Sequence, residues 1–456
     1  MMKRIFELIK SILLVLLVCA TLLMSMQTLI FERLYPFNTG VFSSLRSLYS
    51  DLRKTAGTAK ESSVAERDLW ASSVTLLQPT GDETLFFSGQ AAANQISAVS
   101  ELAAKIISSG TRSSQEGDFA ALITDGSLLF DLGRELTVGM FENLCGYAGR
   151  QGDSIRRMVL TAGENECSLS FESGNNVITY VSESVGPSEL TTAAEAVRRS
   201  GLTVPVLVEG RMLSVGAKPG SLSAKPGDTK LLRALAANPV FGTDGTVQVS
   251  SLQSALAAFD YSVSTLRRDV EEDGTLVYVE NYSNVRISPN GTLLYSAAEP
   301  RRGLSLSRWI PDPSEEGYTA YEVIKAGYAL LDAFQPAMTG SPGGGLRYTG
   351  GVWSDTEDAL TLCYDYVFAG IPVRFEGGEH AVTLTYAGGY FIGAKIHFRT
   401  YAAEQQPYYP AAVGKMFELA EISVGKQPTG FEFVYNDDGD GVLLPRYELT
   451  VDYGVE

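Results

Sequence analysis

The chain holds only two histidines, so few arrangements for proton transfer or metal binding are open to it. His380 lies in a predicted turn, and His397 alternates with apolar neighbours in a predicted strand. Neither has a partner histidine at the spacing of metal ligands. A histidine-dependent triad would have to use one of these two, and no GxSxG motif accompanies them. We therefore interpret both as structural histidines and predict a protein that is not an enzyme, with no catalytic residue, metal or cofactor.

The acidic segment at 436–441 resembles the first half of a calcium loop. Oxygen ligands would come from Asn436, Asp438 and Asp440, with glycine at the sixth position. The twelfth position, however, is Tyr447 rather than the bidentate glutamate that the geometry needs. An Asp/Gly cluster between two predicted strands is typical of a hairpin turn, and we interpret the segment in that way.

The cysteines and carboxylates offer no further recognisable site. Cys19 lies in an apolar run, which leaves Cys145, Cys167 and Cys363 at no metal-like spacing. A disulfide-built fold is not expected, and a single Cys145–Cys167 bridge stays open. Acidic residues are abundant but form no recognisable pair. A carboxylate hydrolase would therefore require two carboxylates that face each other across a cleft.

Composition indicates a globular chain with an acidic surface. The 456 residues are 45% hydrophobic and 20% charged, with a formal net charge of −17. A surface of this sign repels phosphates, so we predict no nucleic-acid partner and poor binding to anionic headgroups. Solubility is the simplest interpretation of the acidity. The length predicts several domains rather than one core.

An uncharged run near the start predicts a membrane helix. Residues 11–31, SILLVLLVCATLLMSMQTLIF, would span about 31 Å as a helix, the thickness of a hydrocarbon core. Lys3, Arg4 and Lys10 precede the run, so the positive-inside rule places residues 1–10 in the cytoplasm and the bulk of the chain outside. Signal-peptide cleavage after Ala20 would leave apolar residues exposed, and we favour an uncleaved single-pass anchor in the cell membrane.

Hydroxyl side chains gather on one face of this predicted helix. Thr21, Ser25 and Thr28 recur at helical spacing, and Gln27 lies in an adjacent stripe. Such residues let membrane helices approach closely and hydrogen-bond to one another, and an amide in lipid needs a partner. These four residues are our candidate helix–helix contacts.

The exterior chain predicts α+β domains of antiparallel sheet with packed helices. Hydrophobic periodicity and turn residues give helices at 91–107, 230–237, 252–259, 319–334 and 411–419, and a clear hairpin around 275–296. The predicted divisions are a juxtamembrane helix and linker at 32–66, then an N-terminal domain at 67–208, a middle domain at 209–308 and a C-terminal domain at 309–456.

The arrangement resembles the YycH family of membrane-anchored regulators of the WalK (YycG) sensor kinase in Gram-positive bacteria. The segments that carry the likeness are GTLVYVE at 274–280 and VRISPNGTLLY at 285–295, with GIPV at 370–373 and LPRY at 444–447. The resemblance implies a non-enzymatic role in two-component signalling and cell wall homeostasis. It also implies association, largely through membrane helices, with the kinase and with a YycI-like protein.

The alternative is an extracytoplasmic binding module for a cell-wall fragment or peptide. Aromatic-rich segments such as 386–401 and 408–409 would then line a groove, although we favour buried sheet faces as the explanation of these aromatics.

Overall fold

The computed structural model describes residues 73–77, 82–86, 89–145, 153–199, 204–208, 231–242, 245–261, 267–280, 282–311, 317–334, 344–354, 358–369, 371–408, 419, 422–423, 430–439 and 441–450. The chain divides into two compact units, Met1–Ser62 and Ser63–Glu456, and every described residue belongs to the second. The predicted tip, membrane helix and juxtamembrane segment lie outside the described residues. Within the described part, no helix combines the length and the apolar character of a membrane span.

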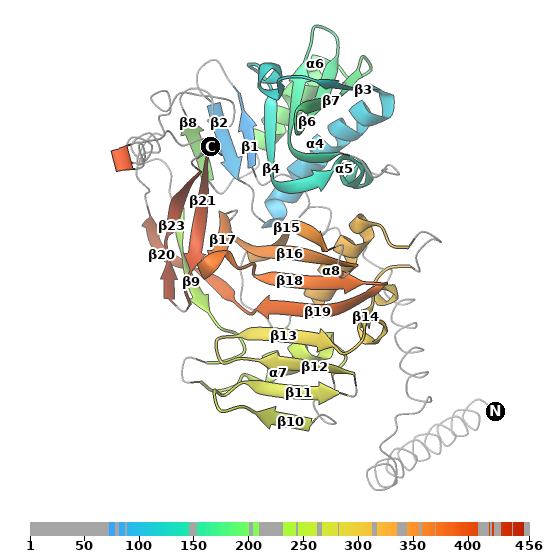
Figure 1. The fold of residues 1–456 in the computed structure, drawn as a ribbon. Coiled ribbons are helices and arrows are strands. Elements are labelled where there is room, and N and C mark those ends of the chain that lie inside the picture. Colours follow the sequence, from blue (N-terminus) through green and yellow to red (C-terminus); the bar gives the residue numbers. More distant parts are fainter. Residues whose placement is uncertain are drawn as a thin grey trace, which may run out of the picture. The chain divides into compact units, whose positions relative to one another are not determined.

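The first sheet has eight strands, all paired antiparallel, in the order β3-β7-β6-β5-β4-β1-β2-β8 (Figure 1). Its strands are β1 (Ser73–Leu76), β2 (Asp82–Phe86), β3 (Thr111–Glu116), β4 (Leu128–Thr137), β5 (Ser154–Ala162), β6 (Cys167–Ser173), β7 (Asn176–Ser182) and β8 (Val204–Val208). All of them lie inside the range predicted for the N-terminal domain. Alternation of side chains buries Met158, Leu160 and Phe171 on one face of this sheet.

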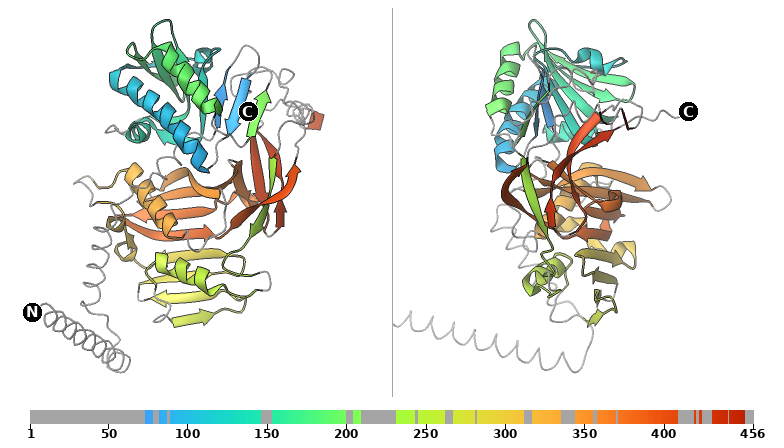
Figure 2. Two further views of the ribbon diagram at one scale, coloured as in Figure 1. Left: turned by 180° about the vertical axis from the view of Figure 1, so that it is seen from behind. Right: turned by 90° about the vertical axis from the view of Figure 1, so that its left-hand side faces the viewer.

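Helices cover that face. The helices α4 (Gly89–Ser109) and α6 (Pro187–Arg199) pack against each other and against β5, β6 and β7 (Figure 2). The shorter α5 (Val138–Leu144) places Phe141 edge-on to Phe171, with ring centroids 5.1 Å apart. On the opposite face, the 3-10 helix η1 (Phe119–Leu122) closes a smaller apolar cluster that includes Val159 and Val177.

The second sheet has twelve strands and joins two segments of the chain that the sequence pattern assigns to separate domains. Its strands are β10 (Arg267–Val270), β11 (Leu276–Glu280), β12 (Ser283–Ile287), β13 (Thr292–Ala297), β14 (Leu304–Ser305), β15 (Gly344–Ser354), β16 (Ala359–Phe368), β17 (Ile371–Phe375), β18 (Val382–Ala387), β19 (Tyr390–His397), β21 (Gly430–Asp437) and β23 (Pro445–Thr450). The link is the pairing of β13 with β19, so the division predicted at 308/309 runs through one sheet.

A small third sheet pairs β9 (Leu231–Ala237) with β20 (Thr400–Tyr408) and β22 (Gly441–Leu443).

Two helices cover one face of the twelve-stranded sheet (Figures 1 and 2). They are α7 (Val249–Ala258) and α8 (Ala320–Ala333), and α8 begins with a reciprocal capping box between Thr319 and Glu322. Aromatic rings fill the layer between helices and strands: Phe259 stacks on Tyr295 at 4.6 Å and contacts Phe334 at 5.2 Å. The described chain is therefore α+β and mostly antiparallel, as predicted.

The helix predicted at 230–237 is wrong, because these residues form strand β9. Leucine and alanine favour a helix locally, yet β9 gains backbone partners from β20 and β22, which follow it by more than 150 residues. The strand alternation is visible in the burial of Ala234 and Ala236 beside the exposed Leu235. The helix predicted at 411–419 lies, apart from its last residue, outside the described residues.

Gly327 provides a test of the packing between α8 and β16. A Cβ atom added at Gly327 would overlap the hydroxyl of Tyr364, which is fully buried. We expect Gly327→Ala to lower the free energy of unfolding by about 1–2 kcal/mol, because overpacking outweighs the gain in helix propensity. Urea unfolding of the full chain measures the loss. In a Tyr364→Phe background the same alanine should cost little, and an undiminished cost there would contradict this packing.

Candidate functional site

A buried carboxylate organises the polar cluster on β16. Asp365 is 1% exposed, and its Oδ1 atom accepts the backbone N–H of Ala381 at 2.9 Å. The Oδ2 atom lies 3.0 Å from Nδ1 of His380 and 3.4 Å from Nη1 of Arg374. A carboxylate so deeply buried requires these donors and cations to offset the loss of hydration.

The alternation of side chains along β16 and one tight turn after β17 bring the residues of this cluster together. Cys363 and Asp365, two residues apart on β16, project to the face opposite Tyr364. After β17 the chain turns through Gly377 and Gly378, whose φ angles of 73° and 74° suit glycine. The turn returns His380 to the face that carries Asp365.

His380 is held in its charged form. The hydrogen bond with Asp365, followed by an interaction with the side chain of Cys363, raises the pKa of His380 to about 10 against the opposing effect of burial. The imidazole is therefore a cation at neutral pH, paired with Asp365 and next to a thiol. Sequence inspection missed this cysteine–histidine–aspartate cluster, because only the Cys363/Asp365 spacing is local and nothing in the pattern indicates that His380 folds back onto it.

The second histidine, His397, makes polar contacts with Thr292 and Glu379. Nδ1 of His397 is 3.0 Å from the hydroxyl of Thr292, its register partner across β13 and β19. Nε2 lies 3.1 Å from Glu379, which also accepts a hydrogen bond of 2.7 Å from Lys395. Burial and then the charge of Lys395 lower the pKa of His397, and its ring stacks on Phe375 at 4.9 Å.

A second buried carboxylate ties β20 and β21 to the turn before β13. Asp437 is 2% exposed, accepts a hydrogen bond of 2.7 Å from the Tyr401 hydroxyl, and lies 3.4 Å from Nε of Arg399. Arg399 in turn donates to the carbonyl oxygen of Asn290 at 2.8 Å. Burial, with the charge of Asp437 beside it, raises the pKa of Tyr401 well above its usual value.

The segment that resembles a calcium loop forms a turn as far as it is described. Asp437 accepts the backbone N–H of Gly439 at 2.9 Å, the contact of an Asx turn. Asp440 lies outside the described residues. Among the residues that are described, no group of three or more metal-ligating side chains is close enough to hold a metal ion.

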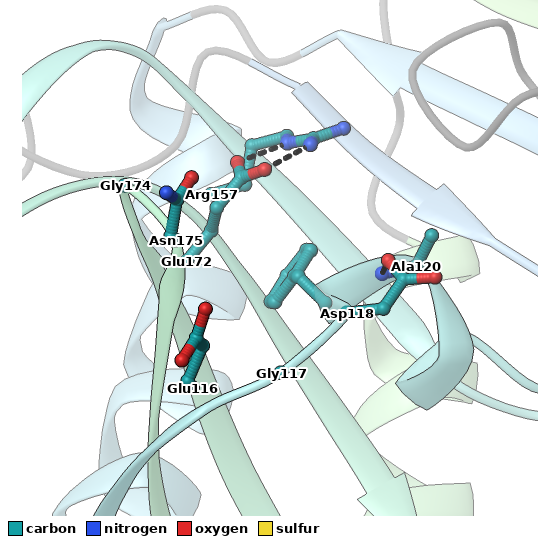
Figure 3. Close-up of a pocket in the computed structure, with 9 residues that line it drawn as sticks. Glu116, Gly117, Asp118, Ala120, Arg157, Glu172, Gly174 and Asn175 are labelled. Atoms are coloured by element: carbon teal, nitrogen blue, oxygen red, sulfur yellow. Dashed lines mark hydrogen bonds and ion pairs between the residues drawn. The ribbon is translucent and has the colours of Figure 1, made fainter.

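A cavity of about 460 Å³ opens beside η1 in the first sheet (Figure 3). Three carboxylates line it, from Glu116, Asp118 and Glu172. Glu172 forms a two-point ion pair with Arg157, whose guanidinium lies 5.4 Å from the centre of the Phe119 ring. Asp118 accepts the N–H of Ala120 at 2.9 Å and caps η1. Two of the three carboxylates thus already have partners, so the cavity gives little support to a carboxylate hydrolase.

The other residues singled out in the sequence separate into three groups. The candidate membrane contacts Thr21, Ser25, Gln27 and Thr28 lie outside the described residues. Cys145 and Cys167 are free thiols, so the bridge left open between them is not formed. In the aromatic-rich segment at 386–401, Phe391, Phe398 and Tyr401 are fully buried, which favours a sheet core over a groove.

Comparison of the chain with protein-family models, with curated proteins and with solved structures gives no match. The site must therefore be interpreted from its own geometry.

Asp365 and His380 predict a pH-dependent stability. Because the folded state raises the pKa of His380 from 6.5 to about 10, their pairing contributes fully below pH 6.5 and is lost as the pH rises toward 10. The imidazole is 37% exposed, so we expect a screened contribution of about 1–2 kcal/mol. Urea unfolding should show His380→Gln less stable than the wild type at pH 6 and nearly equal at pH 10. A constant difference across that range would contradict the pairing.

Breaking the ion pair of Arg399 and Asp437 should lower the stability of the fold more than breaking the pair of His380 and Asp365. Arg399→Met leaves the carboxylate of Asp437 buried without its cation, and we expect a loss of about 3 kcal/mol in the free energy of unfolding. Adding Asp437→Asn should restore part of that loss, because the uncompensated charge is then removed. Thermal and urea unfolding of the single and double variants measure this coupling, and strictly additive losses would argue against it.

Proposed function

We propose that this chain is a membrane-anchored extracytoplasmic protein that regulates a two-component sensor histidine kinase of the WalK type. The observation that carries the proposal is the uncharged run at 11–31, which follows three basic residues and precedes a long folded exterior. The resemblance of 274–295 to the YycH family supports the same role. The partners in this proposal are the kinase, a YycI-like protein and the lipid bilayer.

The described helices leave one face of the twelve-stranded sheet uncovered. The helices α7 and α8 lie on one face of the twelve-stranded sheet. The strand register places Val279, Leu294 and Val352 on the other face, each on a different strand. All three side chains are exposed, with Val352 at 67%. Single exposed apolar side chains of this kind are ordinary on a protein surface and do not by themselves mark an interface.

The physical mechanism is a population shift in the membrane. A helix at 11–31 that packs better against one state of the kinase than against another biases the equilibrium between those states. The exterior domains would then change kinase activity by altering how that helix is presented. No covalent chemistry by this chain is required.

A span exchange tests the mechanism. Replacing residues 11–31 by an unrelated membrane helix should keep the chain in the membrane but abolish its effect on a kinase-dependent reporter gene. A finer variant converts Thr21, Ser25 and Thr28 to leucine, and a matched control converts Leu16, Leu23 and Ile30, on the opposite face, to alanine. We expect the first triple variant to reduce regulation and the control to retain it. Intact regulation after the span exchange would show that the membrane-packing mechanism is wrong.

The second candidate, a binding module, would need an exposed aromatic groove. Phe391, Phe398 and Tyr401 are fully buried, so in 386–401 a groove would have to use Tyr386 and Tyr390, which are partly exposed.

A further inference from the structure

Strand β3 is an open edge of the first sheet. It stands last in the strand order, and among the described strands it pairs only with β7, in an unbroken antiparallel register from Thr111 to Glu116 (Figure 1). All six of its residues are exposed. Its sequence, TRSSQE, contains no proline or lysine, and the register has no bulge, so the common devices that block an edge strand are missing from β3. An edge of this kind can accept a further strand from another chain.

The backbone groups that would bind such a strand belong to alternate residues. In an antiparallel pair, residues that exchange hydrogen bonds with their partner alternate with residues whose N–H and C=O groups point away from it. Gly117, directly after β3, donates its N–H to the carbonyl oxygen of Asn175, the residue opposite, at 3.3 Å. Because the alternation has a period of two, the N–H and C=O groups of Arg112, Ser114 and Glu116 point away from β7.

This edge is complementary to a second copy of itself. When two β3 strands run antiparallel about a twofold axis at Ser114, each Ser114 opposes its counterpart and each Arg112 opposes the Glu116 of the other copy. All the outward N–H and C=O groups of these three residues then have a partner. Opposed side chains lie on the same face, so each guanidinium meets a carboxylate. An axis at Ser113 or Gln115 would separate Arg112 from Glu116.

We propose that β3 is a dimerisation edge, through which two copies of this chain join their first sheets into one continuous antiparallel sheet. The same six residues serve both copies, as an interface with twofold symmetry requires. The partner is a second copy because the charges of Arg112 and Glu116 match when the strand meets itself. The inference does not depend on the proposed regulation of a kinase.

Charge reversal tests this interface in purified full-length protein kept in detergent, with sedimentation velocity as the measure of the dimer. Glu116→Arg places like charges opposite each other on both sides of the axis, and we expect it to weaken dimerisation about tenfold. Adding Arg112→Glu brings opposite charges together again and should restore the dimer. The matched control Glu164→Arg makes the same change at an exposed turn of the same sheet and should leave the dimer intact.

Three results would overturn the proposal. They are a wild type that stays monomeric at the highest concentration reached, a Glu116→Arg variant that is as dimeric as the wild type, and a folded double variant that dimerises no better than Glu116→Arg. Circular dichroism shows whether each variant is folded. A dimer held by another part of the chain is recognised by the second of these results.

Cross-linking tests the register. The two thiols of Ser114→Cys would face each other across the axis, whereas those of Thr111→Cys, three residues from the axis on each strand, would be about 20 Å apart. With a short bismaleimide we expect cross-linked dimers of Ser114→Cys only, above the background that the native cysteines give in the wild type. Ser114→Pro should abolish the dimer and leave the fold intact, because the N–H that it removes points away from β7. Equal cross-linking at both positions, or a folded Ser114→Pro that still dimerises, would contradict this register.

Discussion

The pairing of β13 with β19 is the interaction on which most of the second sheet depends. Its two strands are separated by more than 90 residues, and five consecutive register pairs hold them together. Thr292 and His397 are one of those pairs, and the same junction brings Arg399 to the carbonyl oxygen of Asn290. Without this pairing, the hairpins at 267–297 and the strands beyond 344 would be two incomplete sheets with exposed edges.

Buried charge makes the arrangement around that junction specific. Asp365 and Asp437 are both nearly inaccessible, and each is held by donors from more than one element. Such groups contribute little net free energy, because their desolvation opposes the attraction to their partners. They penalise any alternative register strongly, however, because a slip of one residue would leave an ionised oxygen without a partner. The two histidines of the chain differ because the hydrogen bond with Asp365 raises the pKa of His380, whereas burial and the charge of Lys395 lower the pKa of His397.

Much of the fold can be predicted from local patterns in the sequence. The helix at 319–334 and the hairpin around 288–292 follow from hydrophobic spacing, a capping residue and an Asn-Gly turn, all of which act within a few residues. Strand β9 was misread because its partners lie far away in the chain, and local propensity favoured a helix. The wholly exposed edge strand β3 has no apolar alternation by which it could be recognised. The cluster at Cys363, Asp365 and His380 could not be predicted for a related reason. It forms because the chain turns back after β17, and no pattern of residue spacing indicates that this turn places His380 beside Asp365.

The partners of β9 also determine the order in which the described fold can be completed. The strands of the first sheet pair only among residues 73–208, so that sheet has all its partners as soon as this stretch has emerged. β9 follows directly in sequence, yet it must wait for β20 and for β22, almost at the end of the polypeptide. During synthesis this strand is therefore an unmatched edge for the time taken to produce some 200 further residues. Its exposed row of amides is the point at which a stalled or shortened product would be recognised by a chaperone or protease.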